Sequence, residues 1–363
     1  MDPHTGLARV GRWPDGKVVY ERVISLPEDG TKHVLVTGAD GSGKSGLLNQ
    51  GIANSAVSGW IAPIILDPQN GQALPAWRKV VPYARGIDQC VVWLKALWEA
   101  MQDRSDYMAD LTWIHPKTGR HNDGMGFFNP FTMIIDPVTG EKRPLGLPVI
   151  EITIDEAPIL LDEPGAKELL LKIIKLARKT GTRVRVAAQV PSLTELKDQA
   201  IRSLLVGGGA FCLRSGDKVT GNMTNITAAL HELPKVFLNG QQTFGLGYAA
   251  TLENRPNTPF RADWLEDPYE AAACPHIAKP DSRWSAKMAE IISGEDATAE
   301  KLQQAADSAA SLQLIVLALL PSTKGELISQ FQGKLSLTEI NSAVDDLVAS
   351  GRAVQRNGRI EVK

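Results

Sequence analysis

The stretch Lys32-His33-Val34-Leu35-Val36-Thr37-Gly38-Ala39-Asp40-Gly41-Ser42-Gly43-Lys44-Ser45 determines the fold. Its first six residues form a strand-like run, and the apolar residues Leu47, Leu48, Ile52 and Ala53 that follow it have helical spacing. The glycines between these two runs are typical of a tight loop. The sequence therefore predicts a strand, a glycine-rich loop and a helix in direct succession.

The loop matches the phosphate-binding P-loop pattern at the strand-to-helix junction where its mechanism requires it. Glycines let the backbone wrap around phosphates, so the amides around Gly41, Gly43 and Lys44 are predicted to donate to β-phosphate oxygens at a helix N-terminus. The Lys44 ammonium is expected to bridge the β- and γ-phosphates, and the Ser45 hydroxyl to bind Mg²⁺. The residues predicted to form this site for ATP and Mg²⁺ are Gly38, Gly41, Ser42, Gly43, Lys44 and Ser45.

A second motif follows the apolar strand predicted at residues 147–154. Asp155 and Glu156 come directly after it and resemble a Walker B element. Because an acid at the end of a neighbouring parallel strand lies beside the P-loop, Asp155 is predicted to hold Mg²⁺ and Glu156 to orient and deprotonate the attacking water. Gln189 ends the next strand, where its amide is expected to contact the γ-phosphate and that water. Ordinary turn acids and a solvent-facing glutamine are the alternatives.

Strand-like and helix-like runs alternate along the middle of the chain. Further strands are predicted at 62–66, 183–188 and 209–213, and helices at 90–111 and about 165–180. Such alternation is typical of a parallel sheet covered by helices on both faces, so the predicted fold class is α/β. Residues 115–146 hold several Pro, Gly and Asn and fit a loop excursion or a small hairpin.

The two ends of the chain differ in character from its middle. Residues 7–26 contain the turn signal Pro14-Asp15-Gly16 and are expected to form a hairpin. Near the other end, three short helices are predicted at 312–320, 324–331 and 337–350, followed by two strands around Asn357-Gly358 in the order of a winged helix. The predicted domains are a hairpin lead-in at 1–30, a RecA-like P-loop ATPase motor at 31–252, a peripheral extension or linker at 253–310 and a winged-helix domain at 311–363.

The composition is that of an ordinary globular protein, with 43% hydrophobic and 22% charged residues in 363. The longest uninterrupted apolar run, 314–320, is too short to cross a bilayer, and the Met1-Asp2-Pro3-His4 start has no signal-peptide character. The three cysteines are far apart and fit reduced thiols in a cytosol. We expect a cytoplasmic protein that reaches the inner face of the cell membrane only through partners or a preceding N-terminal region.

The formal net charge of -2 conceals an uneven distribution of charge. Residues 166–214 carry ten basic and three acidic residues, a net charge of +7, so the rest of the chain sums to -9. A solvated helix face and a phosphate-facing surface both remain open as readings of this segment.

The two motifs and their surroundings resemble the FtsK/SpoIIIE/HerA superfamily of ring-shaped DNA motors over residues from about 16 to 250. The resemblance includes Leu176-Ala177-Arg178-Lys179-Thr180-Gly181 and Ala187-Ala188-Gln189-Val190-Pro191-Ser192. In that family a basic helix ending in Gly precedes a sensor strand ending in Gln, often followed by Arg-Pro-Ser, and here Val190 replaces the arginine. A motor with a terminal winged helix is similar to FtsK itself and to the TraB-type transfer proteins of actinobacterial conjugative plasmids. The strand end Asp67-Pro68-Gln69, the short chain and the drifted motifs favour the plasmid-transfer branch over chromosome segregation.

The resemblance implies a homo-hexamer with ATP at the subunit interfaces, and hence an arginine supplied in trans to stabilise charge on the transferring phosphate. Met101-Gln102-Asp103-Arg104 resembles the Met-Glu-Arg-Arg stretch of the family's helix between the Walker motifs. Arg104 is therefore the first candidate, with Arg178 and Arg214 behind it. A surface salt bridge is the alternative for each of the three.

In relatives the winged helix reads short DNA repeats with its third helix in the major groove. Here that helix bears Glu339, Asp345 and Asp346 and no basic residue, which does not suit phosphate contact. Positive charge lies on the wing instead, so the candidate DNA-binding residues are Arg352, Arg356 and Arg359. Docking to a protein is the alternative role for this domain.

Three functions follow from these motifs. The first is ATP-dependent translocation of double-stranded DNA by a hexameric ring, for conjugative plasmid transfer or, alternatively, chromosome segregation. The second is a protein-secretion motor that resembles the EccC ATPases. The third is a nucleotide-gated protein that assembles on DNA without moving. Stimulation of hydrolysis by duplex DNA, stimulation by a peptide, and ATP binding without turnover distinguish the three.

Overall fold

The computed structural model describes residues 2–26, 30–251, 255, 258–294, 322–323, 326–327, 337–350, 352–356 and 359–362. The chain divides into two compact units, Met1–Ile292 and Ser293–Lys363.

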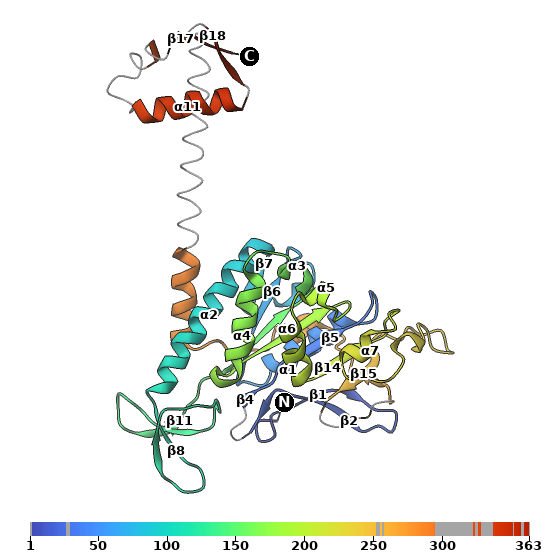
Figure 1. Ribbon diagram of the computed structural model, residues 1–363. Helices are drawn as coiled ribbons and strands as arrows, with labels where there is room; N and C mark the ends of the chain where they lie inside the picture. The colour runs from blue at the N-terminus through green and yellow to red at the C-terminus, as the bar shows by residue number, and fades with distance from the viewer. Residues whose placement is uncertain are drawn as a thin grey trace. The chain divides into compact units, whose positions relative to one another are not determined.

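The first unit is built on a ten-stranded sheet with the order β2-β1-β16-β15-β14-β5-β13-β12-β6-β7 (Figure 1). Its parallel part consists of β14 (Ala210–Leu213), β5 (Val34–Thr37), β13 (Thr182–Ala188), β12 (Val149–Ile154), β6 (Ile61–Asp67) and β7 (Tyr83–Arg85). Every residue of β5, β6, β12, β13 and β14 is buried, as expected for parallel strands covered on both faces. The predicted α/β class is confirmed, and the sheet is large and mostly parallel.

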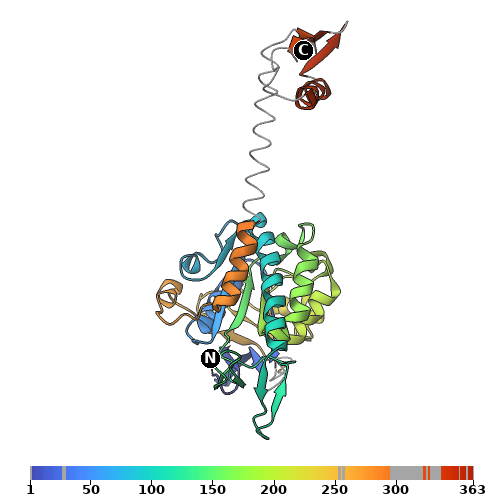
Figure 2. The same ribbon diagram turned by 90° about the vertical axis from the view of Figure 1, so that its left-hand side faces the viewer.

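Helices cover both faces of this sheet, because alternate residues along each strand point to opposite sides. One core contains Ile150 and Ile152 of β12 and packs under α2 (Ile87–Ala109), α3 (Ala157–Leu161), α4 (Ala166–Thr180) and α6 (Gln199–Gly208). The other core contains Val34 and Val36 of β5 and packs under α1 (Lys44–Ala56), η1 (Pro75–Trp77) and α8 (Pro268–Ala272). The helical residues 282–292 run beside α2 in both ribbon views (Figure 1 and Figure 2).

Four antiparallel strands extend the sheet beyond β14. They are β15 (Leu246–Ala250), β16 (Phe260–Ala262), β1 (Leu7–Arg12) and β2 (Val18–Arg22). The hairpin predicted at 7–26 is therefore part of the main sheet, joined to it by the pairing of β1 with β16. Residues 260–262 lie in the stretch that the sequence assigns to an extension or linker. Phe260 is buried against Trp13 and Phe211, and a strand of three residues is too short to show a periodic pattern.

A separate four-stranded sheet occupies the region predicted to be a loop excursion or small hairpin. Its order is β11-β10-β8-β9, from β8 (Thr112–Ile114), β9 (His121–Asp123), β10 (Met133–Ile135) and β11 (Lys142–Pro144). The Trp113 and Phe127 rings pack edge to face with centroids 5.0 Å apart. Strands of three residues between Pro- and Gly-containing turns give too little alternation for a sequence pattern to reveal them.

Two of the ten basic residues counted in 166–214 lie in the interior. Arg183 and Arg185 alternate along β13 on the same side of the strand, and both are at most 1% exposed. Their partners are Glu21 of β2 and Glu151 of β12, so the four charges cancel inside the protein. The positive charge available at the surface of this segment is correspondingly smaller than +7.

The buried His33 lies just before β5 and connects α4 to β13. Its Nδ1 accepts a hydrogen bond from the Val184 backbone N–H at 3.1 Å, so the proton of the neutral ring lies on Nε2, 3.1 Å from the Ile174 carbonyl oxygen. A second ring proton would face the Val184 N–H. Burial lowers the pKa of His33 from 6.5 to about 4.

We expect the free energy of unfolding to decrease as the pH falls from about 6.5 to 4, by up to about 3 kcal/mol from this residue. The unfolded chain binds a proton on His33 in this range, whereas the folded chain excludes it, so acid favours unfolding. Urea unfolding between pH 7.5 and 4.5 measures the slope. His33→Gln should reduce that slope, and the exposed His121→Gln should leave it unchanged. An unchanged slope in His33→Gln would contradict the assignment.

The second unit contains α11 (Leu337–Ala349) and a sheet of order β17-β19-β18, with β17 (Ser322–Thr323), β18 (Ala353–Arg356) and β19 (Arg359–Val362). The third predicted helix and the terminal hairpin thus occur where the sequence places them. The helix predicted at 312–320 lies outside the described residues, as does most of the helix predicted at 324–331. The winged helix therefore stays a prediction. Arg352 and Arg359 are exposed, and Arg356 ends β18.

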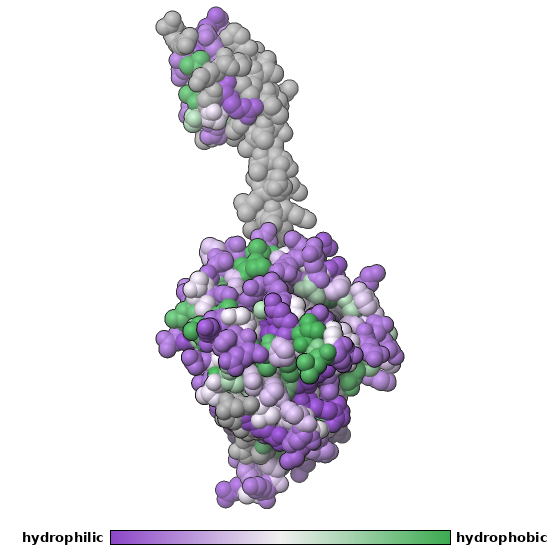
Figure 3. Space-filling model, turned by 90° about the vertical axis from the view of Figure 1, so that its right-hand side faces the viewer, coloured by the Kyte–Doolittle hydropathy of each residue, from purple (hydrophilic) through white to green (hydrophobic). Residues whose placement is uncertain are grey.

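The surface of the first unit is mostly polar, with apolar side chains in separate patches (Figure 3). Its exposed aromatic residues include Phe131, Phe244, Trp264 and Tyr269. None of the helices in the described part of the chain has the length and apolar character that crossing a bilayer requires.

Candidate functional site

The predicted P-loop connects β5 to α1, which begins at Lys44 directly after the loop. Gly43 has φ +104°, and a Cβ there would lie 2.6 Å from the Gly245 backbone nitrogen. A Cβ at Gly38 would lie 2.5 Å from the Ser42 hydroxyl oxygen. Any side chain at these two positions would therefore force the loop apart.

The loop is held in place by the carboxyl end of β14 and the turn before β15. The Ala39 N–H donates to the Arg214 carbonyl oxygen at 3.0 Å, and the Gly245 N–H donates to the Ser42 carbonyl oxygen at 2.8 Å. The Arg214 guanidinium lies 3.4 Å from the Gly41 carbonyl oxygen. Arg214, one of the three arginines considered for a role in trans, is therefore beside the P-loop of its own chain.

Lys44 and Gln189 meet at one carboxylate in the mouth of the loop. The Lys44 ammonium donates to the Gly38 carbonyl oxygen at 2.8 Å and lies 3.7 Å from the Asp40 carboxylate. The Gln189 amide donates to Asp40 Oδ1 at 3.2 Å. The two side chains that the sequence assigns to the γ-phosphate thus converge on an anion that the sequence analysis did not single out.

The acidic pair follows β12 directly. Asp155 is buried, and Glu156 is half-buried with φ +49°, a left-handed conformation that is uncommon outside glycine. Burial, together with the neighbouring Glu156 carboxylate, raises the pKa of Asp155 to about 6. Burial also raises the pKa of Glu156, while Lys44 opposes the shift. Two carboxylates with raised pKa values beside a P-loop are a site where a cation would be stabilised.

The residues present fit a magnesium ion that arrives with a nucleotide. Among the described residues, no group of three or more His, Cys, Asp and Glu could hold a metal ion on its own. Mg²⁺ usually takes one or two protein ligands together with phosphates and waters, which Asp155 and the hydroxyl of Ser45 can supply. The buried Ser42 hydroxyl has no hydrogen-bond partner, so the loop carries an unused polar group as well.

The P-loop borders a hollow of about 280 Å³. It is lined by Ala39, Asp40, Gly41, Gly43, Lys44, Ser45, Gly46, Glu156, Phe244 and Trp264. A neighbouring hollow of about 340 Å³ shares Gly43, Gly46, Phe244 and Trp264 with it. Phe244 and Trp264 belong to no motif, so the sequence does not predict them at this site. Only the folding of the segments around Phe244 and Trp264 onto α1 brings them to the P-loop.

Arg104 lies elsewhere, in the interior of its own chain. Its guanidinium donates to the carbonyl oxygens of Pro148 at 3.0 Å and Thr180 at 3.2 Å, pairs with Asp281 and covers the Trp284 ring with Cζ 4.5 Å from the centroid. Only 3% of the residue is exposed. This environment is unsuitable for a side chain that reaches a neighbouring subunit, and it holds the start of the helical residues 282–292 against α2.

The spacing of the apolar residues along α2 indicates that Arg104 is buried. The buried apolar residues of the helix include Leu94, Leu97, Met101 and Met108, at intervals of three, four and seven residues. Arg104 falls three residues after Met101 and four before Met108, on the same stripe. The resemblance of Met101-Gln102-Asp103-Arg104 to the family's Met-Glu-Arg-Arg stretch does not show whether the arginine points into the protein or out of it.

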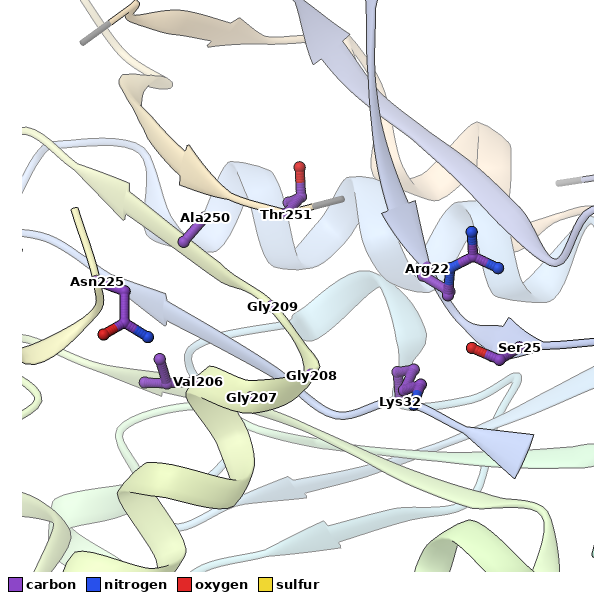
Figure 4. Close-up of a pocket in the computed structure, with 10 residues that line it drawn as sticks. All are labelled: Arg22, Ser25, Lys32, Val206, Gly207, Gly208, Gly209, Asn225, Ala250 and Thr251. Carbon is purple, nitrogen blue, oxygen red and sulfur yellow. The ribbon is translucent and has the colours of Figure 1, made fainter. Parts of the chain in front are cut away.

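Another hollow of the first unit, of about 500 Å³, lies away from the P-loop. Its residues are Arg22, Ser25, Lys32, Val206, Gly207, Gly208, Gly209, Asn225, Ala250 and Thr251 (Figure 4). Lys32 and Gly209 precede β5 and β14, whereas the P-loop follows the carboxyl end of β5. This hollow is therefore at the opposite ends of the parallel strands from the nucleotide site.

Comparison with protein-family models and with curated proteins finds no match. Among solved structures, the cytoplasmic domain of the Thermomonospora curvata type VII secretion ATPase EccC is 17% identical and has a TM-score of 0.55, covering 78% of this chain and 34% of that chain. ATPases 2 and 3 of Thermomonospora curvata EccC in complex with a signal sequence peptide are 18% identical with a TM-score of 0.51, covering 76% and 48%. The monomer form of the pCW3 conjugation coupling protein TcpA with ATPγS is 17% identical with a TM-score of 0.48, covering 74% and 70%.

The chain spans about a third and about half of the lengths of the two EccC chains. At identities below a fifth, the likeness concerns the fold. The large, mostly parallel sheet, the P-loop after β5 and the acidic pair after β12 are together the architecture of a P-loop ATPase. The chain therefore has the α/β fold of the P-loop ATPases to which it is similar.

Proposed function

We propose that the chain is an ATP-hydrolysing motor that moves double-stranded DNA as a hexameric ring. The observation that supports hydrolysis most directly is the meeting of Lys44, Ser45 and Glu156 in one hollow, with Asp155 beside them. A cation at the loop, the Ser45 hydroxyl and two carboxylates with raised pKa values are the kinds of group that phosphoryl transfer to water requires.

Each group has a defined task in this reaction. Lys44 binds the terminal phosphates in place of Asp40 and stabilises their developing negative charge. Ser45 and Asp155 would hold the Mg²⁺ ion, which when bound neutralises phosphate charge. Glu156 orients the water and accepts its proton, and the raised pKa of this carboxyl makes it a better base. Gln189, freed from Asp40, can contact both the water and the phosphate.

The proposed ring requires an arginine from a neighbouring subunit. The three candidate arginines differ in where they lie in the structure. The interior position of Arg104 removes the first of them, and Arg214 touches its own P-loop, where it suits a role in cis. Arg178 is exposed in the last turn of α4 and becomes the leading candidate. ATP at subunit interfaces thus remains part of the proposal, with Arg178 as the residue supplied in trans.

The surface of α4 supports DNA as the cargo. Lys172, Lys175, Arg178 and Lys179 are exposed along this helix. A row of cations on one helix is the kind of surface that binds phosphates by releasing counterions. Within this class we propose conjugative plasmid transfer before chromosome segregation, on the resemblance of the sequence to TraB-type proteins. On the wing, Arg352, Arg356 and Arg359 are proposed to contact DNA.

ATP hydrolysis with and without duplex DNA tests this function. We expect Mg²⁺-dependent turnover that rises severalfold with duplex DNA, and a stimulation that weakens steeply with salt because phosphate contacts carry it. Lys175→Glu with Lys179→Glu should reduce the stimulation. The control, Lys117→Glu with Lys142→Glu, makes the same change of charge on the separate four-stranded sheet and should not.

A second candidate is a motor for polypeptides, favoured by the likeness of the fold to EccC. The same assay separates the two, since a polypeptide motor would respond to peptides and ignore DNA. Turnover that is equal with and without DNA would contradict DNA translocation. Particle images with an ATP analogue and duplex DNA are expected to show six subunits around the duplex, and monomers under these conditions would contradict the ring.

A further inference from the structure

Phe244 and Trp264 form an unusual surface feature beside the P-loop. Both are large aromatic side chains with 41% and 64% of their areas exposed. Their rings are nearly parallel, with an interplanar angle of 23° and centroids 6.5 Å apart. Both line the hollow of the P-loop and the neighbouring hollow of about 340 Å³. Exposing apolar ring surface to water is unfavourable in free energy, and a ligand that stacks on the rings covers that surface.

The first turn of α1 explains why these rings lie so close to the phosphate site. A Cβ at Gly46 would lie 3.4 Å from Cζ3 of Trp264, an ordinary van der Waals distance, so the indole lies directly against the first turn of the helix. On the other side, the close approach of Gly43 to Gly245 presses the segment that carries Phe244 against the start of the same helix. The aromatic pair thus lies against Gly43 and Gly46, the two glycines that flank Lys44 and Ser45.

We infer that Phe244 and Trp264 bind the base of the nucleotide by stacking. This inference rests on the proposed function, which places the phosphates at residues 41–45. The base is joined to those phosphates through the ribose, so it must lie in a hollow that adjoins the P-loop. The hollow of about 340 Å³ meets this condition, because Gly43, Gly46 and the two rings belong to both hollows.

The same geometry indicates that this site discriminates weakly between adenine and guanine. Three backbone N–H groups of the lining are already used, since those of Gly245, Ala262 and Asp263 donate to the oxygens of Ser42, Gly245 and Val10. The Asp263 carboxylate pairs with Arg9. The guanidinium of Arg261 lies over the Phe237 ring, with Cζ 5.0 Å from its centroid.

The remaining polar side chains of the lining are those of Gln241 and Gln242, both exposed. An amide side chain can both donate and accept, so it can adapt to either purine. Stacking itself tolerates every base and grows with ring area. The structure thus assigns affinity to stacking, with purines bound more tightly than pyrimidines and little selection between the two purines.

Equilibrium binding of ATP and of inorganic tripolyphosphate, each with Mg²⁺, tests the inference. Trp264→Ala is expected to weaken ATP binding by about 5- to 100-fold and to leave tripolyphosphate binding unchanged, because only ATP has a base. Phe244→Ala should act in the same direction. Trp264→Phe should restore most of the affinity. Tyr269→Ala is the matched control, since it removes an aromatic side chain of similar exposure outside the two hollows.

The outcomes separate this inference from the proposed function. Equal losses for ATP and tripolyphosphate would overturn it, because the rings would then only shape the phosphate site, and no loss for either ligand would overturn it as well. In the unsubstituted protein, GTP should bind within about threefold of ATP and CTP more weakly, and a preference for ATP over GTP of 30-fold or more would overturn the weak discrimination. If neither ATP nor tripolyphosphate bound, the proposed function would fail first and the inference with it.

Discussion

Replacing Lys44 by alanine is expected to lower the rate of ATP hydrolysis by a factor of about 100 or more. The reason is electrostatic, because a preorganised cation that faces the transferring phosphate commonly contributes 10²-fold or more to the rate. Lys44 is 7% exposed and is held at the loop by the Gly38 carbonyl oxygen, so its charge is aimed before the nucleotide arrives. Steady-state hydrolysis at saturating ATP and duplex DNA measures the effect.

Glu156→Gln, measured in the same hydrolysis assay, separates the chemical step from ATP binding. The amide keeps the shape of the side chain but cannot accept the proton of water, so ATP should still bind while turnover falls about 100-fold. Lys79→Ala, an exposed lysine outside the hollow, should hydrolyse ATP at the rate of the unsubstituted protein. Full DNA-stimulated turnover in Lys44→Ala would show that the catalytic assignment is wrong.

The site residues that the sequence predicted share one property. Each lies at the end of a strand that a local sequence pattern predicts. A parallel sheet brings the carboxyl ends of its strands to one edge. Knowing only that β5 ends at the P-loop, β12 at Asp155 and β13 at Gln189 is enough to expect the three together. The structure brings Gln189 and Lys44 to the same Asp40 carboxylate, so two of the three lie together, and their catalytic roles stay predictions.

The parts that the sequence did not predict depend on contacts between distant segments. Trp264 reaches α1 only because β16 pairs with β15 and β1, and the spacing of residues in these short strands does not predict that pairing. Arg104 resembled a functional arginine by its neighbours in the sequence, while its environment is set by Thr180 and Asp281, which are 76 and 177 residues away. The burial of Arg183 and Arg185 is likewise not predicted from the sequence, because their partners Glu21 and Glu151 are distant in the chain.

A second large effect is expected in the buried cluster of Glu21, Glu151, Arg183 and Arg185. Arg183 lies 3.1 Å from Glu151, and Arg185 lies 2.9 Å from Glu21 and 3.2 Å from Glu151, in addition to the direct pair of Arg183 with Glu21. Burial opposes ionisation of Glu21, yet the two guanidiniums hold the pKa of its carboxyl below the ordinary value. The cluster therefore stays charged, and each member depends on the others.

Glu151→Leu should lower the free energy of unfolding by about 3–5 kcal/mol, because it leaves two buried guanidiniums with one carboxylate. The double variant Glu151→Leu with Arg185→Leu restores a neutral interior around the pair of Glu21 and Arg183, so it should be more stable than the sum of its single changes implies. Chemical unfolding of the single and double variants measures this coupling.

Lys287→Leu is the control. It breaks a surface pair with Glu290 and should lower the free energy of unfolding by less than about 1 kcal/mol. A loss in Glu151→Leu as small as in Lys287→Leu would mean that water reaches the cluster. Since Glu21 belongs to the hairpin and Arg185 to the central strand, the expected large loss would instead show that these four charges fasten the hairpin to the strands that carry the nucleotide site.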